Sequence, residues 1–169
     1  MALTGAEIRV KLTATQTGSN DLATPRYSPV HEALLQFATG TGANQADLFW
    51  ADTRTIAASS TENLDLAGVL ADAFGATVTS AELVAVLITA AAGNTNNVVV
   101  GGAASNTLLM LGDATDKVPV KPGGVFLLAA PNAAGQCTVT AGTGDILLIA
   151  NSSSGTPVTY TVSVLARSA

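Results

Sequence analysis

Short apolar runs recur along this chain at intervals of about ten residues, and turn residues separate them. The runs are rich in Val, Ile, Leu and Thr, and the segments between them contain Gly, Asn, Asp, Pro and Ser. Clear examples are NNVVVGG, TLLMLGD, QCTVTAG and DILLIANSS. This spacing is typical of an all-β sandwich or jelly roll. We therefore predict an all-β fold, an antiparallel β-sandwich or jelly roll, for residues 31–169.

One run, SAELVAVLITAAAG at residues 80–93, is apolar at consecutive positions and ends at a glycine. A strand that is covered on both faces has this pattern, so we predict a central strand there. LAGVLADAFGA at residues 66–76 is the best candidate helix, but Gly68 and Gly75 would each cost about 1 kcal/mol inside one. We expect a loop at that place. HEALLQFATG, residues 31–40, fits either a strand or a short helix capped at Ser28.

The first 30 residues lack a sustained hydrophobic period and contain Pro25 and Pro29 close together. Proline removes a ladder donor and pushes the residue before it toward extended conformations. We predict an extended N-terminal arm or first strand over residues 1–30, with strand structure near Ile8 to Leu12. Such an arm either lies on a neighbouring subunit or moves freely.

Two adjacent glycines, Gly101 and Gly102, follow three valines in VVVGGAASNTLLMLGD. A phosphate-binding loop needs a lysine and a Ser or Thr, and a dinucleotide-binding loop needs a third glycine that opens a helix. The required lysine and third glycine are missing here, and another apolar run follows. We predict a corner where the backbone passes close to another segment. KPGG at 121–124 predicts a type II turn, and AGTGD at 141–145 predicts a tight hairpin.

Charged residues make up only 11% of the chain, against about a quarter in an ordinary soluble domain. The hydrophobic content is 48% and the mean hydropathy is +0.42. The longest apolar run, LVAVLITAAA, is far shorter than the ~20 residues of a spanning helix, and no signal-peptide pattern opens the chain. We expect no membrane partner. A surface of Thr, Ser, Asn, Gly and Ala suits a protein that packs against others.

The formal net charge of −5 and the pI near 4.5 indicate that nucleic acid is not a partner. Phosphate affinity comes mainly from clusters of Lys and Arg, and the sequence contains no such cluster. Aromatic residues make up 4% of the chain, too few for a platform on which bases stack.

Side chains that could carry chemistry are few and scattered. The chain has one cysteine, Cys137, and one histidine, His31, and it contains no GxSxG motif. The sequence alone leaves open whether Cys137 and His31 form a catalytic dyad. Asp113 and Asp116 in GDATD are too few for calcium and are expected to cap turns. The acids between residues 47 and 72 lack the aromatic neighbours of a sugar cleft. We predict no catalytic, cofactor-binding or metal-binding residue and no enzymatic activity.

Interface residues are expected where large side chains stand in polar surroundings. LFWADTR contains Phe49 and Trp50, and Trp50 is the best single anchor, in the core or at an interface. In the N-terminal arm, Arg26 and Tyr27 stand beside the two prolines. We predict that these four residues contact a partner.

Several whole phrases resemble a family of small proteins encoded among the virion structural genes of tailed bacteriophages. They are LDLAGVLADAFGATVTSAELVAVLI, VVVGGAASN, GDATD, VKPGGVFLLAAP and VTAGTGDILLIANSSSGTPVTYTVSV, within residues 35 to 166. The N-terminal arm lies outside the resembling region. The resemblance transfers no catalytic or metal-binding residue.

The resemblance implies a component of a phage particle, most like the capsid decoration (cement) proteins. These are small β-rich proteins, often trimeric, that sit on the outside of the shell and clamp capsomers. We therefore expect a virion location and a partner in the major capsid protein or another virion protein. We also expect a homo-oligomer, with a trimer favoured. The alternative is a tail, baseplate or fibre component that binds host glycan.

Overall fold

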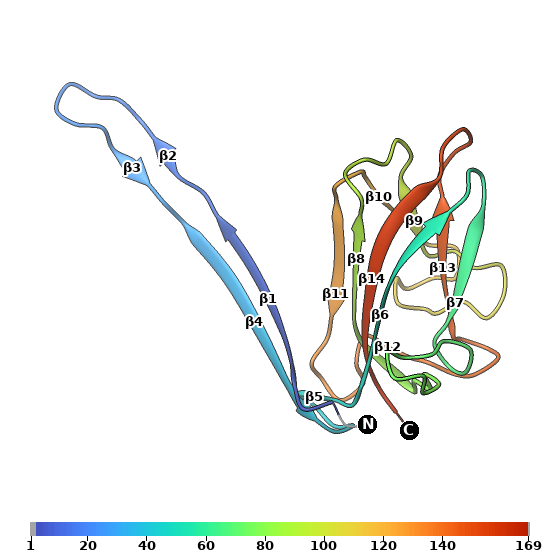
Figure 1. Ribbon diagram of the computed structural model, residues 1–169. Coiled ribbons are helices and arrows are strands. Elements are labelled where there is room, and N and C mark those ends of the chain that lie inside the picture. The colour runs from blue at the N-terminus through green and yellow to red at the C-terminus, as the bar shows by residue number, and fades with distance from the viewer. Residues whose placement is uncertain (1–2, 169) are drawn as a thin grey trace.

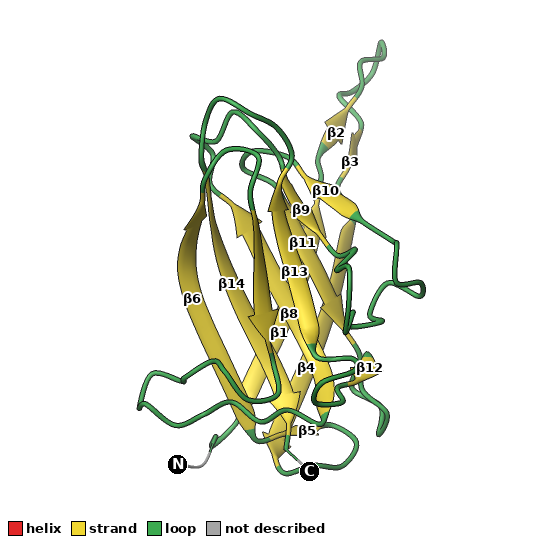
Figure 2. Ribbon diagram, turned by 90° about the vertical axis from the view of Figure 1, so that its right-hand side faces the viewer, coloured by secondary structure: helices red, strands yellow, loops and turns green. Residues whose placement is uncertain are grey.

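The computed structural model describes residues 3–168 and contains strands and loops but no helix (Figure 2). Across this range, then, no helix exists that could cross a membrane. The strands are β1 (Ala6–Thr13), β2 (Gln16–Thr17), β3 (Arg26–Tyr27), β4 (Val30–Thr39), β5 (Gln45–Ala46), β6 (Leu48–Ile56), β7 (Thr61–Asp65), β8 (Glu82–Ala90), β9 (Val98–Val100), β10 (Val118–Val120), β11 (Val125–Ala129), β12 (Cys137–Thr138), β13 (Ile146–Asn151) and β14 (Val158–Arg167).

Two sheets lie face to face in a sandwich-like unit (Figures 1 and 2). The first sheet has the order β11-β8-β14-β6, with β12 also pairing with β8, and the second has the order β10-β9-β13-β7. Every pairing within these two sheets is antiparallel. Ile88 and Val162 of the first sheet and Val100 and Ile149 of the second belong to one buried apolar core. The prediction of an all-β fold with antiparallel sheets is confirmed.

Strand β8 is the central strand that the sequence predicts. It lies between β11 and β14, and it is apolar on both of its faces. Val86 and Ile88 are fully buried in the core between the sheets. Val84 and Ala85 belong to a second apolar cluster on the outer side of the same sheet. Because both faces are covered along this part of the strand, the usual alternation of polar and apolar residues is missing.

The N-terminal segment forms a long two-stranded hairpin that leans away from the sandwich (Figure 1). Strands β1 and β4 are antiparallel, with Ala6 opposite Phe37 and Thr13 opposite Val30, and β2 pairs with β3 beyond them. The strand alternative for residues 31–40 is therefore right and the helix alternative is wrong. The expected boundary at residue 30 falls at the start of β4, inside the hairpin, because residues 30–37 of β4 pair with β1.

Glycines make two sharp features of the sandwich, as the sequence indicates. Gly123 has a φ of 72°, and the amide of Gly124 donates to the Lys121 carbonyl at 2.8 Å, so KPGG forms the type II turn. Gly101 has a φ of 99°, and a Cβ there would lie 2.5 Å from the carbonyl oxygen of Asp116. That close approach confirms the predicted corner.

The hairpin prediction for AGTGD is wrong, although the turn itself is tight. Gly142 has a φ of 73°, and Thr140 and Gly144 form an isolated antiparallel bridge around it. The strands on either side, β12 and β13, belong to different sheets. The segment is a crossing between the sheets, and short-range turn signals do not distinguish such a crossing from a hairpin. Residues 66–76 form turns and loop, as expected.

Candidate interaction surface

The hairpin is amphipathic, because successive residues of a strand point to opposite faces. The apolar face carries Ala6, Ile8, Val10 and Leu12 of β1 and, across from them, Phe37, Leu35, Ala33 and His31 of β4. The opposite face carries the charged side chains Glu7, Arg9, Lys11 and Glu32, and Leu34 and Val30 are exposed on the same face. Three ion pairs join the four charged residues at 3.6 Å. Exposed pairs of this kind contribute about 0–1 kcal/mol each, so they stabilise the hairpin only weakly.

The base of the hairpin packs on the outer side of the first sheet. Phe37, 3% exposed, clusters with Val84, Ala85 and Leu165 of the sandwich. Strand β5 runs parallel to the end of β4 and continues the contact, with Ala46 fully buried. This small core sets where the hairpin leaves the sandwich.

A buried arginine at the end of β14 fixes this junction. Arg167 is 0% exposed. Its Nη1 donates to Glu82 Oε2 at 2.7 Å and to a loop carbonyl, that of Ala133, at 2.8 Å. Its Nη2 donates to the carbonyl of Asn132, and its Nε donates to the carbonyl of Gln45 in β5. One guanidinium therefore joins three parts of the chain through four hydrogen bonds. The burial of Arg167 could not be expected from the sequence, since LARSA has no feature that marks a buried side chain.

Beyond the base, the hairpin has no cover. Every residue from Arg9 to Leu34 is exposed. On its apolar face Val10 is 45% exposed and Leu12 is 71% exposed. A two-stranded hairpin is at best marginally stable in water, and it needs a third strand or a packing surface. We call residues 9–34 the distal arm.

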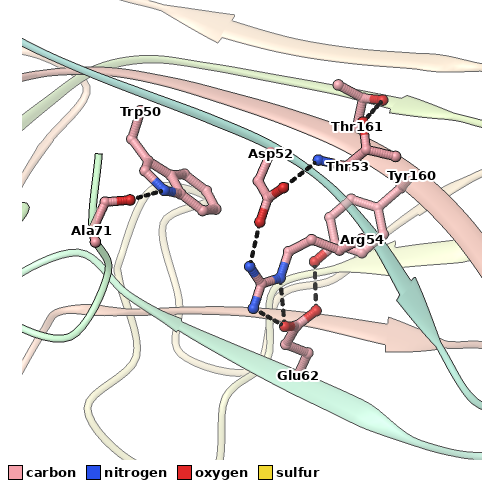
Figure 3. Close-up of polar contacts among 8 residues, drawn as sticks. All are labelled: Trp50, Asp52, Thr53, Arg54, Glu62, Ala71, Tyr160 and Thr161. Carbon is pink, nitrogen blue, oxygen red and sulfur yellow. Dashed lines mark hydrogen bonds and ion pairs between the residues drawn. The ribbon is translucent and has the colours of Figure 1, made fainter. Parts of the chain in front are cut away.

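The outer face of the first sheet is uncharged. Its rows, taken from the strand register, are Ala129–Ala85–Leu165–Phe49, Leu127–Leu87–Ser163–Ala51 and Val125–Thr89–Thr161–Thr53. None of these residues carries a charge, and Phe49, Leu87 and Val125 are exposed. Neighbouring threonines pair their hydroxyl groups, as for Thr53 and Thr161, whose Oγ1 atoms lie 3.0 Å apart (Figure 3). We call this surface the outer sheet face.

A groove of about 640 Å³ lies between the hairpin and the outer sheet face. Residues 6–11 of β1 form one wall, and Phe49, Leu87, Val125 and Leu127 are among the residues of the other. Both walls are largely apolar, and both remain open to solvent. The groove with its two walls is the candidate interaction surface of this protein.

Three of the four predicted interface residues are exposed. Phe49 lines the groove and is 52% exposed. Arg26 and Tyr27 form β3 in the distal arm and are also exposed. Trp50 is different, because it is 5% exposed and its Nε1 donates to the carbonyl oxygen of Ala71 at 3.1 Å (Figure 3). Its ring belongs to the core and is not available to a partner.

A connected polar cluster lies at the side of the sandwich (Figure 3). Arg54 of β6 donates from Nε to Glu62 Oε1 at 2.5 Å and from Nη1 to Asp52 Oδ2 at 2.6 Å. The hydroxyl of Tyr160 donates to Glu62 Oε2 at 3.0 Å. Burial and then the nearby Glu62 carboxylate raise the pKa of Tyr160 well above its usual value, so the phenol keeps its proton. These side chains bond to one another, and the cluster joins β6 and β7, the edge strands of the two sheets.

The remaining candidates for chemistry have structural roles or lie far apart in the fold. His31 lies on the exposed hairpin, while Cys137 is half-buried in β12. Burial raises the pKa of the Cys137 thiol to about 11, so it is a poor nucleophile at neutral pH. The Asp113 amide donates to Asp116 Oδ2, and the Thr115 amide donates to Asp113 Oδ1. Hydrogen bonds from the amide and the hydroxyl of Thr115 lower the pKa of Asp113, and the contacts of both aspartates confirm that they cap turns.

No family model, curated protein or solved structure matches this chain. The resemblance to phage virion proteins thus remains an expectation. Function has to be argued from the distal arm, the outer sheet face and the groove between them.

Proposed function

We propose that this protein is a structural subunit of a tailed-bacteriophage particle and acts as a decoration, or cement, protein on the outer surface of the capsid. The observation that carries the proposal is the distal arm, a run of residues 9–34 in which every side chain is exposed. A hairpin of this length with one apolar face is stable once something else covers it. The arm is therefore an attachment device of a subunit that works inside an assembly.

The distribution of charge supports the same role. Residues 1–39 carry three basic and three acidic side chains, which cancel, so the net charge of −5 resides in residues 40–169. A neutral arm can approach an acidic neighbour without repulsion, and desolvating its uncharged side chains costs little. The uncharged outer sheet face has the same property.

We infer further that the sandwich is a jelly roll. Four nested pairings support this: β6 with β14, β7 with β13, β8 with β11, and β9 with β10. A chain doubled into a long hairpin and then wrapped produces this nesting, and eight-stranded jelly rolls are common in viral capsid and lectin domains. Such an analogy is compatible with the virion proposal, and the arm and the groove supply the specific argument.

The mechanism of reinforcement is mass action. A protein that binds only the assembled shell stabilises it by the free energy of that binding. The partner is the major capsid protein or another virion protein, and the subunit acts as a homo-oligomer, with a trimer favoured, since closed symmetric oligomers match the symmetric junctions of a lattice.

The experiment is a copy-number measurement on purified particles of the phage that encodes the chain, by quantitative mass spectrometry against the major capsid protein. A decoration protein is present in hundreds of copies per particle. A count of a few to some tens would contradict the capsid location and favour the tail.

The alternative is a tail, baseplate or fibre component that binds host glycan. A loop hollow of about 550 Å³ favours it, because Ser105, Asn106, Thr115 and Lys117 offer polar groups there. Asn106 lines this hollow and has a φ of 53°, in the left-handed region that Asn adopts more readily than most non-glycine residues. Binding of purified protein to host polysaccharide, abolished by Asn106→Ala and unaffected by Leu12→Glu on the arm, would support this alternative over the capsid role.

A further inference from the structure

We infer that the distal arm of one copy docks on the outer sheet face of a second copy of this chain. The inference rests on the proposed function in one respect, namely that the subunit works in an assembly. It adds the contact by which two copies of the chain associate. The copy number of the protein in a particle does not test that contact.

The two surfaces match in chemistry. The arm offers Val10, Leu12 and the exposed tip residue Leu22, and the sheet offers Leu87 and Val125, all at least 38% exposed. The sheet surface holds no charged side chain among its described residues, and the apolar face of the hairpin holds only His31 as an ionisable group. Burying these surfaces against each other leaves no unpaired charge, which is the condition for a stable apolar contact.

The arm also has the size of an interface. It is a stretch of 26 consecutive exposed residues, from Arg9 to Leu34. A stable protein–protein contact uses roughly 20–30 residues a side. Between Thr13 and Val30 only Asp21 and Arg26 are charged, so most of the end of the arm is uncharged.

The arm does not reach the outer sheet face of its own copy. Phe37 packs the hairpin base on Val84 and Ala85, and Arg167 bonds to β5 beside it. From this fixed base the hairpin diverges from the sheet (Figure 1), and the groove of about 640 Å³ stays open between them. Each copy therefore carries one uncovered arm with an apolar face and one uncovered, uncharged sheet face.

Such a contact joins two different patches of the same chain, the arm and the sheet face. It is satisfied by two copies that exchange arms or by a closed ring in which each arm lies on the next sheet. The proposed trimer is one such ring. In either arrangement the arm-on-sheet contact alone covers both the distal arm and the outer sheet face.

The test uses two variants and one matched control in the full-length chain, with mass measured by light scattering after size exclusion. Leu12→Glu places a charge on the apolar face of the arm, and Leu87→Glu places one in the middle of the outer sheet face. Thr13→Glu adds the same side chain one residue along, on the charged face of the hairpin. We expect an oligomer for the wild type and for Thr13→Glu, and monomers for the two leucine variants, with dissociation constants raised at least about 100-fold.

Mixing the two leucine variants gives the decisive result. The Leu12→Glu chain keeps an intact sheet and the Leu87→Glu chain keeps an intact arm, so the mixture forms a one-to-one complex although neither variant associates alone. Fluorescence of the buried Trp50 shows that each variant is folded. A monomeric wild type, an oligomer that survives both variants, or a mixture that stays monomeric would overturn the inference.

The outcomes also separate this inference from the proposed function. A wild type that is monomeric alone, yet present in hundreds of copies on particles, overturns the arm-on-sheet contact and leaves the decoration role standing. A wild-type oligomer with the expected variants, combined with a low copy number, overturns the capsid location and leaves the contact standing.

Discussion

Arg54 of β6 and Glu62 of β7 join the edge strands of the two opposed sheets through a hydrogen bond of 2.5 Å from Nε to Oε1. Backbone hydrogen bonds do not connect these two strands, which lie in different sheets. The hydrogen bond with Glu62 is also the main reason why the pKa of Arg54 is raised. At this side of the sandwich, side chains therefore hold the two edge strands together, as backbone hydrogen bonds hold neighbouring strands together within each sheet.

Replacing the acceptor should loosen this side of the sandwich. We expect Glu62→Gln to lower the free energy of unfolding by about 1–3 kcal/mol, because Arg54 and Tyr160 both lose a charged partner. Urea unfolding followed by Trp50 fluorescence measures the change. Glu32→Gln, in the exposed ion pairs of the hairpin, is the control and should change stability by less than about 1 kcal/mol. Equal effects of the two variants would contradict the role of Glu62.

Tyr160 should make the protein sensitive to alkali. Burial raises the pKa of Tyr160 in the folded state, while an unfolded tyrosine titrates near 10. Below about pH 10 both states hold the proton and stability is full, and above it the unfolded state releases its proton first and stability falls. We expect Tyr160→Phe to lose about 1.5–3 kcal/mol near neutral pH but to flatten the decline above pH 10.

The chain contains one other tyrosine, which serves as the control for this experiment. Tyr27→Phe alters an exposed ring in the distal arm and should leave the free energy of unfolding unchanged. Unfolding at a series of pH values between 7 and 11 measures both variants. An unchanged alkaline slope in Tyr160→Phe would show that another group causes the decline.

Cys137 should react slowly with alkylating reagents. Burial raises its pKa to about 11, so at pH 8 its thiolate fraction is at least 100-fold below that of an unfolded cysteine, whose pKa is about 8.5. We expect iodoacetamide labelling, followed by mass spectrometry, to be slower by about that factor in the folded chain than in urea. The labelling rate should rise as the pH approaches 11. Rapid labelling at pH 8 would reopen the possibility of a reactive cysteine.

Gly101 should tolerate no side chain. Alanine there meets a positive φ and a Cβ position 2.5 Å from the Asp116 carbonyl oxygen, so we expect Gly101→Ala to cost about 2–5 kcal/mol. Gly142 has a similar positive φ with no atom within 4 Å of its Cβ position. Gly142→Ala should therefore cost only the conformational part, about 1–2 kcal/mol. Thermal or urea unfolding of the two alanine variants measures both losses of stability. The difference between them is the cost of the close contact at Gly101, beyond the cost of the positive φ.

Replacing the buried arginine at the hairpin junction should lower the stability of the fold strongly. Arg167→Met leaves the Glu82 carboxylate and three carbonyl groups without their donors, and we expect a loss of about 3–5 kcal/mol. Arg9→Met on the exposed face of the hairpin is the matched control, with an expected change below about 1 kcal/mol. A small effect at Arg167 would mean that apolar packing around Phe37 fixes the junction by itself.

Local patterns in the sequence were sufficient for the strands and for most of the turns. The central strand β8 follows from its continuous apolar run, and the type II turn follows from Pro122 and Gly123. These features depend on residues that are neighbours in the chain, so their signals are local. The crossing at Gly142 was mistaken for a hairpin, because a turn residue does not tell which sheet the next strand joins.

The sequence did not predict which single polar and aromatic residues are buried. The sequence left Trp50 open between the core and an interface, and it lies in the core. Arg167 gave no sign of burial in the sequence, although it is fully buried. In both cases the partners are distant in the chain: Ala71 for Trp50, and Gln45 and Glu82 for Arg167. Hydrogen bonds between residues that far apart leave no periodic signal.

The sequence by itself determined that this is an all-β chain with few charges, because strand propensity, turn residues and charge content are properties of residues and their near neighbours. Only the tertiary structure decided that the first segment is a hairpin standing free of the sandwich, with an uncharged sheet facing it across a groove. Those features depend on strand register and on which apolar faces find cover, and long-range packing alone sets both.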